Sequence, residues 1–85
     1  MRLKKTANVL EFLEAVSHCR KDVYFCTKDG DRLDLSSELM RFVMISQLGN
    51  QEFIYESTIE LADPDEYHIL KPFVAMMGVF SNAIQ

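Results

Sequence analysis

The sequence predicts an α+β domain in which helices cover one face of a small, mostly antiparallel sheet. Segments rich in β-forming residues and segments with helical periodicity follow one another in the order β-α-β-β-α-β-α. The strongest turn signal, Asp29-Gly30, joins two of the strands directly as a hairpin. Because the connections are short, we expect a two-layer, open-faced sandwich with three helices on one face of the sheet.

The first strand and helix are expected within residues 2–20. Residues 2–6 can form a short strand with Leu3 facing inward. A helix is expected over residues 9–20, because Asn8 stands three residues before Glu11, which is the spacing of a capping box. Its apolar stripe consists of Val9, Phe12, Leu13 and Val16.

A β-hairpin is expected next. Residues 23–28 are rich in β-forming side chains and alternate between two faces, and residues 31–35 form the returning strand. The two residues between them, Asp29 and Gly30, favour a type I′ turn with positive φ at both positions.

The second half of the chain predicts a helix, a strand and a last helix. Apolar residues recur at helical spacing after Ser37, which we expect to cap the second helix, and Gly49 should stop it. Residues 53–61 have the composition of a strand. The stripe of the second helix consists of Leu39, Met40, Val43 and Leu48, widened by Phe42, Met44 and Ile45.

The last helix should begin at Asp63-Pro64 and kink or end early at Pro72. Asp63 can cap it, and Glu66 stands at the position that completes a capping box. Its stripe is Ile69 or Leu70, Phe73, Met77 and Phe80. The sheet face away from the helices would then carry Tyr24, Thr58 and Glu60.

The composition fits one small domain spanning residues 1–85. At 48% hydrophobic and 26% charged residues, the chain is too short for two independent cores. The net charge is −4 and the basic residues are dispersed, whereas a nucleic-acid binder concentrates them on one face. A small basic patch remains the alternative, formed by Arg2, Lys4 and Lys5 with Arg20 and Lys21.

Residues with reactive side chains do not form a recognisable catalytic pattern. Cys19 and Cys26 lack CxxC spacing, which favours two reduced, partly buried thiols. His18 and His68 stand at no recognised ligand spacing and are expected to be exposed. The acidic cluster Asp29, Asp31, Asp34 and Glu38 is best explained as a polar turn followed by a helix N-terminus. We therefore expect no catalytic residues, no metal and no cofactor.

The passage LDLSSELMRF, residues 33–42, leads from a strand into an apolar helix that ends in Leu48-Gly49. With the element order and the hairpin, it resembles the HPr family, the histidine-containing phosphocarriers of the bacterial sugar phosphotransferase system. The resemblance implies a four-stranded sheet in the order 1-4-2-3 with three helices on one face.

The chain departs from this family at the start of the first helix. The phosphocarriers have a His-Ala-Arg-Pro type motif there, and residues 5–9 of this chain read KTANV. Without a histidine at that point, the resemblance implies no phosphohistidine transfer. Ser37 matches the position of the regulatory serine kept by the catabolite-repression paralogues of HPr, and Ser36 precedes it.

We therefore expect a cytoplasmic, non-catalytic regulatory protein that acts through protein contacts as a monomer or weak homodimer. The candidate partner-binding residues are Glu38, Met40 and Arg41, and the candidate phosphorylation sites are Ser37 and Ser36. Nucleic acid and membranes are not expected as partners, since basic residues are dispersed and no segment reaches transmembrane length. Two alternatives remain: a small-ligand or nucleic-acid binding module that uses the open sheet face, or a self-assembling structural protein.

Overall fold

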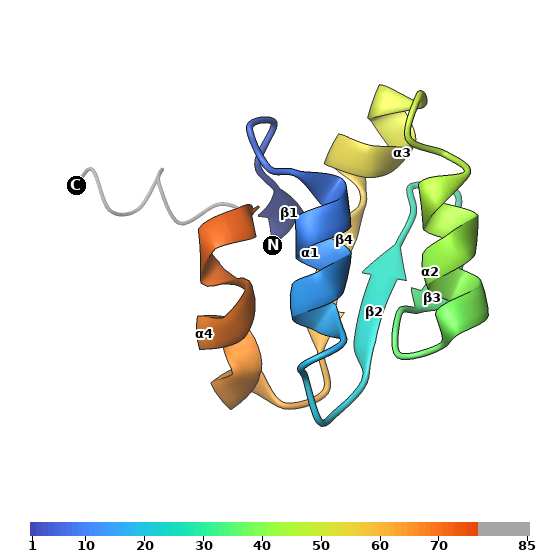
Figure 1. Cartoon of the computed structure of the whole chain (residues 1–85). Coiled ribbons are helices and arrows are strands. Elements are labelled where there is room, and N and C mark those ends of the chain that lie inside the picture. Colours follow the sequence, from blue (N-terminus) through green and yellow to red (C-terminus); the bar gives the residue numbers. More distant parts are fainter. Residues whose placement is uncertain (77–85) are drawn as a thin grey trace.

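The computed structural model describes residues 1–76 and has the α+β architecture that the sequence predicts (Figure 1). The strands are β1 (Arg2–Leu3), β2 (Val23–Cys26), β3 (Arg32–Asp34), β4 (Thr58–Leu61) and β5 (Val74–Ala75). The helices are α1 (Val9–Val16), α2 (Glu38–Ile45), α3 (Gln51–Glu56) and α4 (Tyr67–Leu70), and the 3₁₀ turns Pro64–Glu66 and Lys71–Phe73 flank α4.

The strands form two small antiparallel sheets. One has the order β3-β2-β4, and the other pairs β1 with β5. The backbone N–H of Ile59 in β4 donates to the carbonyl of Met1 at 2.6 Å, so the start of the chain lies against β4. Leu3 is buried as expected, although β1 is shorter than the predicted strand.

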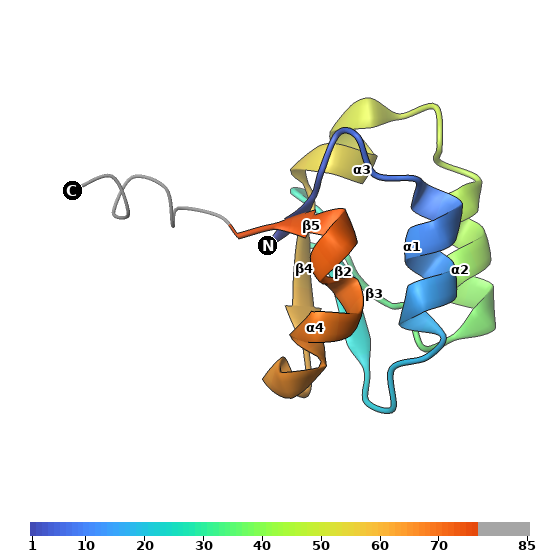
Figure 2. The same ribbon diagram turned by 60° about the vertical axis from the view of Figure 1, so that its left-hand side comes forward.

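Helices α4, α1 and α2 lie side by side in front of the strands (Figure 1), and α1 and α2 occupy the same side of the three-stranded sheet (Figure 2). The core lies between these layers, where Val23, Phe25 and Ile59 of the sheet meet the apolar stripe of α1. The stripe predicted for α1 is confirmed: Val9, Phe12, Leu13 and Val16 are all buried.

The hairpin is confirmed, but the predicted type I′ turn is wrong. Only Gly30 has a positive φ, +93°, whereas type I′ requires Asp29 to have one as well. The N–H of Gly30 donates to the Thr27 carbonyl at 3.1 Å, and the N–H of Thr27 donates to the Asp31 carbonyl at 2.8 Å. The loop therefore has three residues, Lys28 to Gly30, with the glycine in the left-handed position that such loops use.

The strand predicted over residues 53–61 is wrong in its first half, where α3 forms. Asn50 caps this helix by accepting the N–H of Phe53 at 3.1 Å. The helical conformation buries Ile54 and places the Phe53 ring 5.4 Å from that of Phe25. Packing therefore outweighs the β preference of these side chains, which is weak and depends on context.

Two helix ends also differ from the prediction. Helix α1 ends at Val16, so His18 and Cys19 lie in the turn that follows it rather than in the helix. Helix α2 ends at Ile45, before Gly49, so the glycine is not its stop. The C-cap residue is a serine in both helices, Ser17 in α1 and Ser46 in α2. Each serine hydroxyl donates to a carbonyl of the last helical turn, and this hydrogen bond can end a helix without a glycine.

The start of the last helical region is as predicted, except for the role of Glu66. Asp63 accepts the N–H of Asp65 at 3.0 Å, and the α-helix ends at Leu70 before Pro72. Two residues of the predicted stripe, Met77 and Phe80, lie outside the described residues.

The Glu66 carboxylate does not complete a capping box but reaches across to the α1–β2 turn. It is only 8% exposed and accepts the backbone N–H groups of Arg20 at 2.6 Å and Lys21 at 3.0 Å. These hydrogen bonds favour the ionised form and lower the pKa of Glu66 below its ordinary value of 4.5. The carboxylate thus fastens this turn to the start of α4.

Glu66→Gln is expected to melt several degrees below wild type at pH 7, because an amide cannot accept two N–H groups as an anion does. The folded state gains stability from the ionised carboxylate above about pH 4.5, and this gain is lost as the pH falls toward the lowered pKa. The difference between wild type and variant should therefore shrink on acidification, which thermal melts from pH 7 to pH 3 measure. Glu60→Gln, at an exposed ion pair, is the control, and an equal loss in both variants would contradict the role of Glu66.

Candidate functional site

The outward side of α2 carries the most exposed large apolar side chains in the described part of the chain. Leu39 is 65% exposed and Phe42 is 70% exposed. They stand three residues apart and therefore neighbour each other on the helix surface. Together with Glu38 they line a shallow groove of about 370 Å³, and we call these three residues the α2 face.

The opposite side of α2 holds the helix on the core. Met44 is fully buried, and Val43 and Ile45 are partly buried. The apolar surface of this helix is therefore wider than its contact with the core. The sequence also indicates that this apolar surface is wide. The stripe predicted from it was wrong at Leu39 and Leu48, which were expected to face the core but are exposed.

The two serines before α2 are held by local hydrogen bonds. Ser37 is the N-cap, as predicted, and its hydroxyl oxygen accepts the N–H of Met40 at 3.4 Å. The N–H of Ser36 donates to Oδ1 of Asp34 at 2.9 Å. The Ser36 side chain is exposed and that of Ser37 is partly buried.

The three candidate partner-binding residues have different surroundings. Glu38 belongs to the α2 face, and Met40 is half-buried beside it. The guanidinium of Arg41 turns back along the helix and donates to the carbonyls of Leu35 at 2.9 Å and Ser36 at 3.2 Å. Arg41 therefore stabilises the junction between β3 and α2. Leu39 and Phe42, the two exposed apolar residues of the α2 face, were not among the binding residues predicted from the sequence.

The open sheet face is occupied by paired polar groups. Tyr24 stands opposite Asp34 on one side and Glu60 on the other. The guanidinium of Arg32 lies 3.9 Å from the centre of the Tyr24 ring and 3.4 Å from a Glu60 oxygen. The Tyr24 hydroxyl donates to Asp22 at 3.0 Å, and this hydrogen bond raises the pKa of the phenol.

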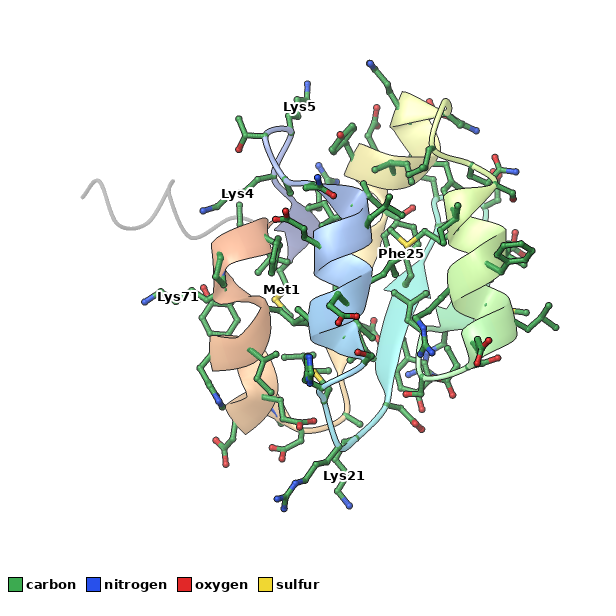
Figure 3. All side chains as sticks on the ribbon, in the orientation of Figure 1. Met1, Lys4, Lys5, Lys21, Phe25 and Lys71 are labelled. Carbon is green, nitrogen blue, oxygen red and sulfur yellow. The ribbon has the colours of Figure 1, made fainter. Side chains whose placement is uncertain are left out.

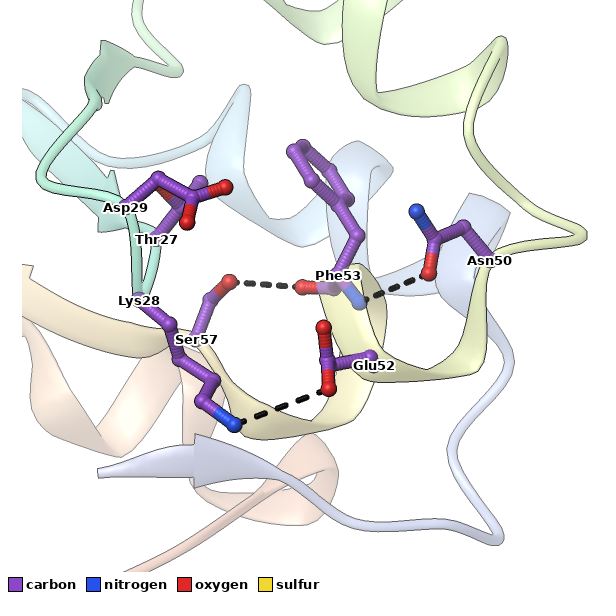
Figure 4. Close-up of a pocket in the computed structure, with 7 residues that line it drawn as sticks. All are labelled: Thr27, Lys28, Asp29, Asn50, Glu52, Phe53 and Ser57. Atoms are coloured by element: carbon purple, nitrogen blue, oxygen red, sulfur yellow. Dashed lines mark hydrogen bonds and ion pairs between the residues drawn. The ribbon is translucent and has the colours of Figure 1, made fainter.

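A small polar cleft lies between the hairpin loop and α3 (Figure 4). Its volume of about 60 Å³ holds roughly two water molecules. Lys28 pairs with Glu52 at 3.6 Å and Glu56 at 3.1 Å, and the nearly buried Ser57 hydroxyl donates to the Phe53 carbonyl. These groups satisfy one another, so the cleft holds the hairpin loop against α3 and is too small for an organic substrate.

The cysteines and histidines agree with the sequence predictions. Cys19 and Cys26 are free thiols of intermediate burial, and burial raises the pKa of both. Raised pKa values reduce the thiolate fraction and hence the reactivity. His18 and His68 are exposed. Within residues 1–76, no group of three or more His, Cys, Asp or Glu side chains could hold a metal ion.

The alternative of a single basic patch is wrong. Lys4 and Lys5 lie near one end of the molecule, and Lys21 lies at the opposite end (Figure 3). The groove beside Arg2 and Lys5 is also lined by Glu52 and Glu56, which offset their charge.

No family model, curated protein or solved structure matches this chain. The described residues contain no helix of the length and apolarity needed to cross a membrane. A functional assignment therefore depends on the geometry of the α2 face and of the junction between β3 and α2.

Proposed function

We propose that this chain is a non-catalytic, HPr-like regulatory protein that binds a protein partner through the α2 face. The observation that carries the proposal is the adjacent exposure of Leu39 and Phe42, at 65% and 70%. Apolar side chains gathered in this way are typical of protein interaction sites. The carboxylate of Glu38 borders them and would favour a partner with a basic group at the rim of its apolar surface.

The arrangement of strands supports the resemblance to HPr. The order β3-β2-β4, extended by the hydrogen bond from Ile59 to Met1, is compatible with the implied order 1-4-2-3. Asn8 accepts the N–H of Glu11 at 3.1 Å and caps α1 at the point where the phosphocarriers have their histidine motif. We infer a cytoplasmic regulatory role without phosphohistidine transfer.

The α2 face is a better binding surface than the open sheet face. On the sheet face, the guanidinium of Arg32 is already paired with Glu60 and stacked on Tyr24. Asp34 adds a further negative charge there, which disfavours a polyanion such as nucleic acid. The α2 face offers exposed apolar area that a partner can bury.

Phe42→Ser tests the proposed surface. The variant should fold like wild type, because Phe42 lies outside the core, and should retain fewer partners when the full chain is used to capture proteins from a native lysate. Quantitative mass spectrometry of the captured proteins measures the loss. Leu10→Ser is the matched control, since Leu10 is 54% exposed on α1. Equal capture by wild type and Phe42→Ser, or equal losses in both variants, would refute the assignment.

The regulatory role of Ser37 is a further part of the proposal. A phosphate at the N-terminus of α2 would be favoured by the helix dipole and opposed by Glu38. Ser37→Ala is expected to lower the free energy of unfolding by about 0.5–1 kcal/mol, the lower part of the range for a cap, because the cap hydrogen bond is long at 3.4 Å.

Ser37→Asp separates capping from regulation, because aspartate also caps helices. A regulatory site predicts that Ser37→Asp alters partner capture while its melting temperature stays close to that of wild type. Identical capture by the serine and aspartate proteins would leave Ser37 as a cap alone.

A further inference from the structure

The α2 face has negative charge at both of its ends. The carboxylate of Glu38 stands in the first turn of α2 and lines the groove together with Leu39 and Phe42. Its full charge exceeds the roughly half positive charge that the peptide dipoles place at the N-terminus of a helix. At the other end, the last turn of α2 contains no basic side chain, so no cation offsets the partial negative charge of the C-terminal carbonyls.

The basic residue of α2 does not neutralise this surface. Arg41 donates to the carbonyls of Leu35 and Ser36, so its guanidinium lies at the junction with β3 and does not line the groove. Residues 42–70 contain neither lysine nor arginine. The α2 face therefore combines exposed apolar side chains with a negative electrostatic potential, which complements a partner that is both apolar and basic.

The geometry of α2 sets the spacing of the groups that would fit it. Leu39 and Phe42 lie on successive turns, so the apolar strip runs along the helix axis. From Glu38 to Ile45 the helix rises by about 10 Å, at 1.5 Å per residue. A second helix lying along α2 would match both negative ends with basic residues about seven positions apart, on either side of two apolar residues.

A second copy of this chain fits the α2 face poorly. Two such faces brought together would supply no cation to either Glu38, because none of the residues that line the groove is basic. Large apolar side chains bury roughly 200 Å² each, whereas a stable interface buries about 1,200–2,000 Å² in total. The two apolar side chains of the α2 face therefore suit a short segment of another protein better than a homodimer.

We propose that the α2 face binds an amphipathic helical segment of its partner that has lysine or arginine at both ends of its apolar stripe, an inference that rests on the proposed function. One partner cation would lie beside the Glu38 carboxylate, and the other beside the C-terminal carbonyls of α2. Leu39 and Phe42 would pack against the apolar residues between them. Helices that lay an apolar face into a groove are a common form of peptide recognition.

Two designed peptides, each held helical by a side-chain staple, test the proposal through the amide resonances of the full chain. One has lysines about seven positions apart on either side of two leucines, and the other has glutamates in place of the lysines. The lysine peptide should shift the amides of Leu39 and Phe42 and bind severalfold more tightly than the glutamate peptide. Added salt should reduce the difference, because it screens exposed charges.

Glu38→Gln should weaken binding of the lysine peptide severalfold. Glu60→Gln is the matched control, because it removes an exposed carboxylate from the open sheet face and should leave the affinity unchanged. Equal affinities of the two peptides for wild type, equal weakening in both variants, or shifts that avoid the α2 face would each overturn the inference.

Failure of this inference and failure of the proposed function give different results. If Phe42→Ser lost captured partners while the two peptides bound alike, the α2 face would bind a protein but not a basic helix, and only the inference would be overturned. Sedimentation of the free protein tests the remaining occupant. A wild-type homodimer that dissociates in Phe42→Ser would assign the α2 face to a second copy and would also overturn the inference.

Discussion

Phe25→Ala is expected to lower the free energy of unfolding by about 3–5 kcal/mol, the usual cost of removing a buried aromatic side chain. Phe25 is fully buried in the central strand β2 and lies beside Phe53, with the ring centres 5.4 Å apart. A domain of this size is typically stable by roughly 4–13 kcal/mol, so the variant should lose a large part of its stability. Chemical denaturation of wild type and variant measures the difference.

Phe25→Leu is the control, because it keeps an apolar side chain and leaves a smaller cavity. It should lose less stability than Phe25→Ala. Truncation of a core aromatic residue costs about 3–5 kcal/mol. If Phe25→Ala lost less than about 1 kcal/mol, β2 would not be the centre of the core.

Gly30→Val is expected to lower the free energy of unfolding by about 1–3 kcal/mol through backbone strain. The φ of Gly30 is +93°, a conformation that a β-branched residue rarely adopts. An added Cβ would meet nothing within 4 Å, so the loss comes from the backbone and not from a clash. Thermal or chemical denaturation measures it.

Gly49→Val is the matched control for this substitution. Gly49 does not have a positive φ, and its Cβ would also meet nothing within 4 Å. Valine should therefore be tolerated better at this position than at Gly30. Equal losses at the two glycines would show that the left-handed conformation of the hairpin loop contributes little to stability.

Features that depend on neighbouring residues were predicted well from the sequence. The three predicted caps, Asn8, Ser37 and Asp63, all accept backbone N–H groups at the starts of their helical segments. The hairpin was found because its turn signal lies within a few residues. Its turn type was not, because the loop is closed by hydrogen bonds of Thr27, one residue further from the turn than expected.

Features that depend on tertiary packing were predicted less well. Residues 53–56 have β-forming side chains, yet they form α3 because Asn50 caps a helix and Phe53 packs on Phe25. Periodicity showed that α2 has a wide apolar surface but not which part of it the core would cover. The exposure of Leu39 and Phe42, on which the candidate site depends, could therefore be seen only in three dimensions.

The pairing of β1 with β5 determines when, during synthesis of the chain, the two-stranded sheet can form. Strands β2 and β3 are adjacent in sequence, and a hairpin of this kind forms in about 1–10 μs. Leu3, in contrast, pairs with Val74, so β1 cannot pair with β5 until residue 74 has been made. At about 5–20 residues per second, the ribosome adds the intervening residues over several seconds. A nascent chain that stalls before Val74 therefore exposes the unpaired edge of β1 to chaperones and proteases.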